Sequence, residues 1–126
     1  QWFSGCWNEE AAIRYSQEFR DKTKHLNGTS WAIFSFFDEW ELGVPEIEPH
    51  IIDLCQQFKE NGCIKDCHIY RPSLLKNMQL ENIIPQSEGH YERRVFVEAA
   101  DAIAWMKECH FTIEVKEFLT SLSANT

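Results

Sequence analysis

The residues best suited to hold a metal are two cysteines and a histidine in the segment Cys63-x-x-x-Cys67–His68. Structural zinc sites use cysteine or histidine ligands, usually in pairs about two to four residues apart. No second pair follows at that spacing, and His50 and Cys55 could contribute only if the fold brought them close. Side chains alternate along a strand, so Cys67 and His68 would point to opposite faces. We therefore expect no metal site, and interpret these residues as buried thiols beside an exposed histidine.

Cysteine-based catalysis would need a thiolate, a base and an orienting group within hydrogen-bond reach of one another. Cys109 and His110 are sequence neighbours late in an expected helix, where their side chains should point apart. The chain has no G-x-S-x-G nucleophile elbow and no glycine-rich phosphate loop. We therefore expect that the protein is not an enzyme, and that it has no catalytic residue and no cofactor.

An acidic run follows the most apolar stretch of the chain. Its members are Asp38, Glu39, Glu41, Glu46 and Glu48. Hard cations bind carboxylate oxygens, so a divalent cation site is one interpretation. The simpler interpretation, which we favour, is that Glu46 and Glu48 stabilise the positive end of a helix while the other carboxylates are solvated.

Composition and charge narrow the class of protein. The chain has 126 residues, 44% of them apolar and 13% aromatic, which suits one folded domain and is too apolar for a disordered segment. Its 12 basic and 20 acidic residues give a net charge of −8, so nucleic acid and anionic membranes are poor partners. No stretch approaches the roughly 18 apolar residues needed for membrane insertion. Five cysteines without a signal peptide favour reduced thiols and a cytoplasmic location.

The hydrophobic pattern predicts strands and helices in alternation. We expect strands over 1–6, 30–37, 63–70 and 94–97, and helices over 8–27, 45–61, 73–84 and 99–109, with a last helix over 111–122. Asn8 and Ser73 are the expected N-caps of two helices. The run Trp31 to Phe37 is typical of a strand covered on both faces, and we place it inside the sheet. Residues 38–43 are polar and should form a loop.

Such alternation predicts an α/β fold, with a mainly parallel sheet of about four strands and helices on its flanks. The chain has no repeat and no linker, so residues 1–126 are expected to form a single domain. Gln1 begins abruptly inside an apparent strand, and we therefore expect an earlier first strand to be missing from the sequence.

Three motifs resemble, in order, segments of the SpoIIAA-like (STAS-like) proteins of bacteria. The segment Gly5–Cys6–Trp7–Asn8–Glu9–Glu10–Ala11 looks like that family's G-x-W/F-N-x-E opening. The apolar run up to Asp38, followed by Trp40–Glu41–Leu42–Gly43–Val44–Pro45–Glu46, resembles its strand-Asp-x-x-x-x-G-x-P-E stretch. Arg94–Val95–Phe96 with Ala102–Ile103–Ala104–Trp105–Met106 resembles its closing strand and helix. The resemblance spans nearly the whole chain, and implies a β/α sheet with flanking helices, no cofactor and no catalytic residue.

The same resemblance implies a function. In the wider STAS fold, some members bind kinase partners and are switched by a phosphorylated serine in the loop after an internal strand. The matching loop here, 38–44, contains no serine or threonine. We therefore predict a regulatory or protein-interaction module without the serine switch, whose protein partner is unknown. The alternative is a binder of small apolar ligands, because an aromatic-rich core could line a cavity.

The candidate site lies in two loops that follow strands, 38–44 and 71–73. Ligands on open α/β sheets bind outside the carboxyl ends of the strands. The residues that we predict at this surface are Asp38, Trp40, Arg71 and Ser73. Trp40 is either an exposed anchor for a partner or a lid on the core. Trp2, Phe3 and Trp7 could instead cover a neighbouring subunit, so a homodimer stays open.

Overall fold

Parallel strands form two small sheets in the computed structural model, which describes residues 1–84 and 87–111. The larger sheet has the order β2–β4–β5, formed by β2 (Trp31–Phe36), β4 (Cys63–Ile69) and β5 (Glu92–Phe96). The smaller sheet pairs β1 (Gly5–Trp7) with β3 (Trp40–Gly43). The predicted α/β class is confirmed. The single sheet of about four strands is wrong, because the chain divides its strands between two sheets.

The expectation of a loop over 38–43 is wrong because this segment contains β3. Among its polar residues is one large apolar side chain, Trp40, which is only 3% exposed. The strand is fixed by backbone hydrogen bonds from Gly5 to the Glu39 carbonyl (3.0 Å) and from Val44 to the Trp7 carbonyl (2.9 Å). A strand in a two-stranded sheet needs no continuous apolar run, so the pattern gave no sign of it.

The expected strand over 1–6 divides into two parts. Only its end belongs to β1, whereas Trp2 forms an isolated parallel bridge with Phe36 at the free edge of β2. The Phe3 amide donates to the Phe36 carbonyl at 2.9 Å. The interior strand is β4 rather than β2, although β2 is largely buried as expected.

Helices lie close to their predicted ranges. They are α1 (Glu9–Thr23), α2 (Glu48–Glu60), α3 (Leu74–Ile83) and α4 (Ala99–Glu108), with short 3₁₀ turns at Lys24–Leu26 and Pro45–Ile47. The Asn8 side chain accepts a hydrogen bond from the amide of Ala11, and that of Ser73 accepts one from the amide of Lys76. Both predicted N-caps are therefore confirmed. The helix expected over 111–122 lies outside the described residues, apart from its first position.

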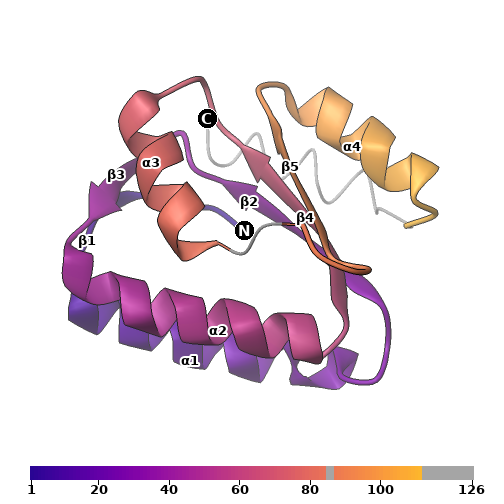
Figure 1. Ribbon diagram of the computed structural model, residues 1–126, viewed down its shortest axis with the longest axis horizontal. Coiled ribbons are helices and arrows are strands. Elements are labelled where there is room, and N and C mark those ends of the chain that lie inside the picture. The colour runs from indigo at the N-terminus through magenta and orange to yellow at the C-terminus, as the bar shows by residue number, and fades with distance from the viewer. Residues whose placement is uncertain (85–86, 112–126) are drawn as a thin grey trace.

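The helices cover the two faces of the larger sheet unequally. The steps from β2 to β4 and from β4 to β5 run in the same direction, so right-handed crossovers place α2 and α3 on one face. Helices α1 and α2 lie side by side under that face, and α4 lies against the other (Figure 1). The larger apolar cluster fills the space under α1, α2 and α3, whereas a smaller one lies under α4.

Candidate functional site

The two predicted loops meet at the carboxyl ends of β2 and β4. The Asp38 carboxylate accepts a hydrogen bond from the backbone N–H of Arg71 at 2.8 Å, and its Oδ1 lies 3.3 Å from Arg71 Nε. Lys76 reaches back from α3 and donates to the carbonyls of Phe37 and Asp38, both at 2.8 Å. These contacts fix the first turn of α3 to the end of β2.

The other two predicted residues are used within the fold. Ser73 is half-buried and caps α3. Trp40 is buried, and its ring packs 5.5 Å from that of Phe37. Of the two interpretations of Trp40, the structure supports the lid on the core. The surface-accessible part of the predicted site is therefore Asp38 and Arg71.

The cysteines and histidine of the 63–68 segment do not converge. Cys63 packs in the larger apolar cluster and Cys67 in the smaller one, on the opposite face of the sheet. His68 points away from Cys67, as predicted, but it is only 1% exposed, so the expectation of an exposed histidine is wrong. The reason is that β4 is the central strand and is covered on both faces. Within the described ranges, no three Cys, His, Asp or Glu side chains could share a metal ion.

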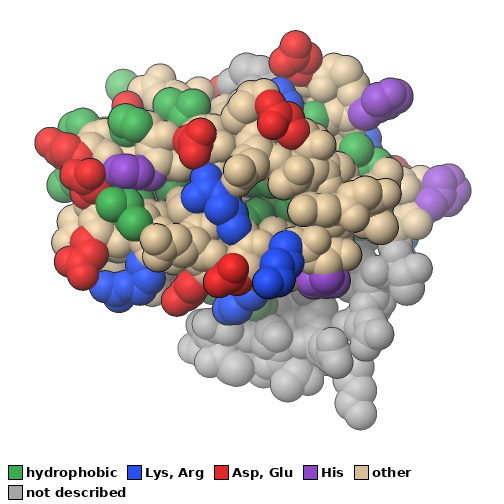
Figure 2. Space-filling model, turned by 90° about the horizontal axis from the view of Figure 1, so that it is seen from below, with side chains coloured by type: hydrophobic (Ala, Val, Ile, Leu, Met, Phe, Trp, Pro, Cys, Tyr) green, Lys and Arg blue, Asp and Glu red, His purple; other side chains and the backbone are tan. Residues whose placement is uncertain are grey.

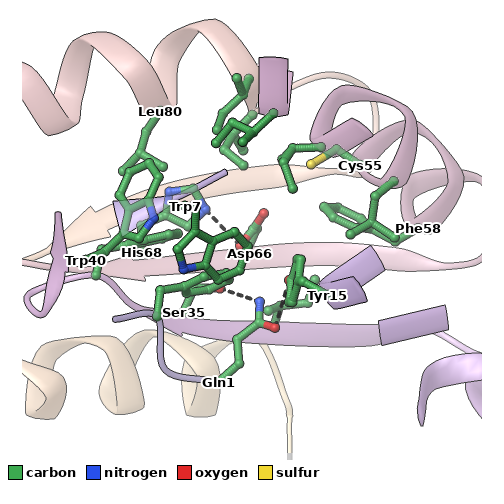
Figure 3. A pocket seen from close by; sticks show the side chains of 18 residues that line it. Gln1, Trp7, Tyr15, Ser35, Trp40, Cys55, Phe58, Asp66, His68 and Leu80 are labelled. Carbon is green, nitrogen blue, oxygen red and sulfur yellow. Dashed lines mark hydrogen bonds and ion pairs between the residues drawn. The ribbon is translucent and has the colours of Figure 1, made fainter. Parts of the chain in front are cut away.

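A buried polar cluster lies beneath α1, α2 and α3, and the sequence analysis did not identify it. Ser35 is paired in register with His68 on the neighbouring strand, and Asp66 lies two residues before His68 on the same face. All three are at least 98% buried. The available signal was the alternation of Asp66 and His68 with the apolar Cys67 and Ile69 in a strand. Figure 3 shows this cluster with the surrounding aromatic side chains.

Asp66 is the centre of this cluster. Its Oδ2 accepts a hydrogen bond from the Tyr91 hydroxyl at 2.7 Å, and its Oδ1 lies 3.1 Å from His68 Nε2. Burial, together with the negative charge of Asp66, raises the pKa of Tyr91 far above its usual range. Tyr91 therefore stays protonated and remains a donor to the carboxylate. The Gln1 side chain links two further groups, because it donates to Ser35 Oγ and accepts from the Tyr15 hydroxyl.

A cavity of about 40 Å³ adjoins the cluster. Its wall is mostly aromatic and aliphatic, and includes Phe37, Ile47 and Leu80. Three buried atoms of its lining residues, Trp40 Nε1, His68 Nδ1 and Asp66 Oδ1, have no hydrogen-bond partner among the described residues. A buried polar atom left in this condition costs about 1–3 kcal/mol. The cavity is smaller than the roughly 150 Å³ of an engineered cavity that takes benzene.

The outer surfaces of the helices differ in character. On the face formed by α1 and α2, acidic and basic side chains are spread among a few apolar ones (Figure 2). Two ion pairs bridge these helices, Arg20–Asp53 at 2.9 Å and His50–Glu9 at 3.1 Å. Helix α3 instead exposes three large apolar side chains, Leu74 (76% exposed), Leu75 (63%) and Met78 (58%). The polar Asn77, Glu81 and Asn82 are exposed on the same helix.

Three thiols should be chemically inert in the folded protein. Burial raises the pKa values of Cys55, Cys63 and Cys67 well above that of a free thiol, so these groups stay protonated. Cys6 is exposed, although its contact with Glu41 also raises its pKa. We expect iodoacetamide at about pH 8 to modify Cys6 at least roughly 100-fold faster than the three buried thiols. Peptide mass spectrometry measures each site, and equal labelling without denaturant would contradict this burial.

Comparison of the sequence with family models and with curated proteins, and of the structure with solved structures, finds no match. Within residues 1–84 and 87–111, no helix has the length and apolar character needed to cross a bilayer.

Proposed function

We propose that this chain is a non-enzymatic regulatory or protein-interaction module that binds its partner through the outer face of α3. The observation that carries the proposal is the exposure of Leu74, Leu75 and Met78 on one helix. Contiguous exposed apolar side chains mark interaction surfaces on soluble proteins. The resemblance to SpoIIAA-like proteins supports the same class of function. Asp38 and Arg71 lie at the base of this helix and belong to the proposed surface.

Helix α3 is apolar on two sides. Leu80 and Ile83 are buried against the core, while the three residues of the outer face contact solvent. Contact between these three apolar side chains and water is unfavourable. A partner that covers the outer face would remove this apolar area from water at about 25 cal/mol per Å².

The proposed surface is held in place before any partner arrives. Gln79 forms two hydrogen bonds with the backbone of Gly43 in β3, at 2.8 and 2.9 Å. Lys76 is tied to the end of β2, and Asn77 accepts a hydrogen bond from the Tyr70 hydroxyl. A rigid surface loses little conformational freedom on binding, which favours affinity.

Charge on this surface is balanced and does not select the sign of the partner's charge. The Arg71 side chain is 76% exposed but is paired with Asp38, and Lys76 donates to two backbone carbonyls. Glu81 is exposed on the same helix. We therefore propose a partner protein that presents an apolar patch to the outer face of α3.

The alternative function, binding of a small apolar ligand, has weaker support. Its observation is the interior cavity, but a volume of about 40 Å³ leaves little room for an apolar molecule. The outer face of α3 is already exposed, so a partner protein could bind there without a change in the structure. For this reason the interaction module is our first proposal.

Leu75→Glu should abolish partner binding without unfolding the protein. The side chain is 63% exposed, so the free energy of unfolding should change by less than about 0.5 kcal/mol. A carboxylate in the centre of the face would lose its hydration on binding. Retention of partner proteins from cells of the source organism, quantified by mass spectrometry, measures the effect.

The matched control is Ile52→Glu, because Ile52 is 47% exposed and lies on a different helix, α2. We expect one protein to be retained by the wild type and by Ile52→Glu, and to be reduced at least about tenfold by Leu75→Glu, as for the loss of a central contact. A protein that is lost equally with both variants, or with neither, would refute the proposal.

A further inference from the structure

The two methionines of the chain lie in opposite environments. Met78 is 58% exposed on α3, whereas Met106 on α4 is 0% exposed and packs in the smaller apolar cluster. The two helices lie on opposite faces of the larger sheet (Figure 1). A thioether is oxidised at its sulfur, so an oxidant must reach that atom directly. In the folded protein, Met78 offers this access and Met106 does not.

The position of Met78 makes its oxidation state important for the outer face of α3. Leu74 and Leu75 precede it by four and three residues, a spacing that places the three side chains next to one another on the helix surface. A sulfoxide is a polar group, and burying it in an apolar contact without a hydrogen-bond donor is unfavourable. One added oxygen atom would therefore make this apolar surface partly polar.

The fold should tolerate such a change. Met78 belongs to neither apolar cluster of the described residues, and the buried side of α3 carries Leu80 and Ile83 instead. Two hydrogen bonds between the Gln79 side chain and the backbone of Gly43 also hold the helix in place. Oxidation of Met78 would thus alter the binding surface without releasing the helix that carries it.

We propose that Met78 is a reversible oxidation site, and that its oxidation by a hydroperoxide releases the partner from the outer face of α3. With hydrogen peroxide, the sulfur lone pair bonds to one oxygen, the O–O bond breaks, and the second oxygen takes the proton of the first and leaves as water. The thioether is oxidised to a sulfoxide, and the peroxide is reduced. Methionine sulfoxide reductases restore the thioether with electrons from a thiol reductant. The release of the partner rests on the proposed function, whereas the oxidation of Met78 does not.

Four of the five cysteines should compete poorly for the oxidant. Thiols react with peroxide as thiolates, and burial keeps Cys55, Cys63 and Cys67 protonated. The hydrogen bond from the exposed Cys6 thiol to Glu41 raises the pKa of Cys6 and so lowers its thiolate fraction. The thioether of Met78 has no proton to lose, so its oxidation needs no ionisation.

Peptide mass spectrometry after treatment of the folded protein with hydrogen peroxide tests the site. We expect Met78 to be oxidised at least about tenfold faster than Met106, because Met106 can react only when the core around it opens. In denaturing urea the two rates should become equal. Equal rates in the folded protein would overturn the site, whatever any partner does.

Partner retention tests the release. The probe is the protein that the wild type retains from cells of the source organism and that Leu75→Glu loses. We expect peroxide to reduce its retention by the wild type at least about fivefold, as for one buried polar group without a hydrogen-bond partner. A sulfoxide reductase with dithiothreitol should restore it. Met78→Leu has no sulfur at this position, so peroxide should not change its retention of the partner, whatever the level before treatment.

The outcomes separate this proposal from the proposed function. Equal retention by oxidised and untreated wild type, an equal loss from Met78→Leu on oxidation, or no recovery with the reductase would overturn the release and leave the proposed function intact. If the untreated wild type retains no protein that Leu75→Glu loses, the proposed function fails and the release fails with it. The oxidation site is then still decided by the rates at Met78 and Met106.

Discussion

Replacing Trp40 by alanine should lower the free energy of unfolding by about 3–5 kcal/mol, the range for losing a large buried aromatic side chain. Trp40 is the first residue of β3, is 3% exposed and packs in the larger apolar cluster. Its removal would leave a cavity that neighbouring side chains fill only in part. Urea denaturation followed by circular dichroism measures the change.

Trp40→Phe is the matched control. It keeps an aromatic ring in contact with Phe37 and removes an indole N–H that has no partner among the described residues. We expect a much smaller loss of stability than for alanine. If Trp40→Ala instead changed the free energy of unfolding by less than about 0.5 kcal/mol, as at a surface position, the side chain would be an exposed anchor rather than a lid.

The second large effect is expected for Asp66→Ala, which should cost about 2–6 kcal/mol of stability, because two buried polar groups lose their partner at about 1–3 kcal/mol each. The carboxylate is 98% buried and is the partner of Tyr91 and His68. Its removal would leave the Tyr91 hydroxyl and His68 Nε2 without an acceptor in the core. Urea denaturation at neutral pH again gives the change in stability.

Tyr91→Phe is the corresponding control, because it removes one hydroxyl and keeps the ring. We expect it to cost about 1.5–3 kcal/mol, the contribution of a hydrogen bond to a charged group. An Asp66→Ala variant that is no less stable than Tyr91→Phe would show that water solvates the carboxylate, and that the buried cluster is not the one described.

Local signals were enough to predict the helices. Asn8 and Ser73 cap α1 and α3 as expected, and the α3 helix ends before Pro85. These features depend on contacts between residues close in sequence. Residue types that cap a helix or that precede proline therefore predict where it begins and ends. The run Trp31 to Phe37 was correctly identified as a buried strand, because covered parallel strands are apolar along their whole length.

Long-range pairing could not be predicted from these patterns. β3 forms because it pairs with Gly5 and Trp7, which come more than 30 residues earlier in the chain. The sequence of residues 38–43 alone does not indicate this pairing. The same limit hid the polar cluster. Asp66 and His68 are typical of a solvated strand face, and only α1, α2 and α3 together bury them.

The two loops of the predicted site lie together in the structure, and two of its four residues, Trp40 and Ser73, are used within the fold. The loops at 38–44 and 71–73 do meet, through Asp38 and Arg71. Leu74, Leu75 and Met78 were predicted to be helical, but the helix pattern did not show which side of α3 would face the core. The side of α3 that faces the core is the one that carries Leu80 and Ile83, which are buried near β3 and α2.

Photo-crosslinking tests the proposed function most directly. A benzophenone amino acid placed at Leu75 should form a covalent adduct with one partner protein in cells of the source organism, whereas the same group at Ile52 should not. Both side chains are exposed, so the comparison reports position on the surface and not accessibility. A single adduct specific to position 75, and lost when Met78→Glu is added, is the result that we predict. No adduct at position 75, the same adduct from both positions, or only a crosslinked dimer of this chain would contradict the proposal.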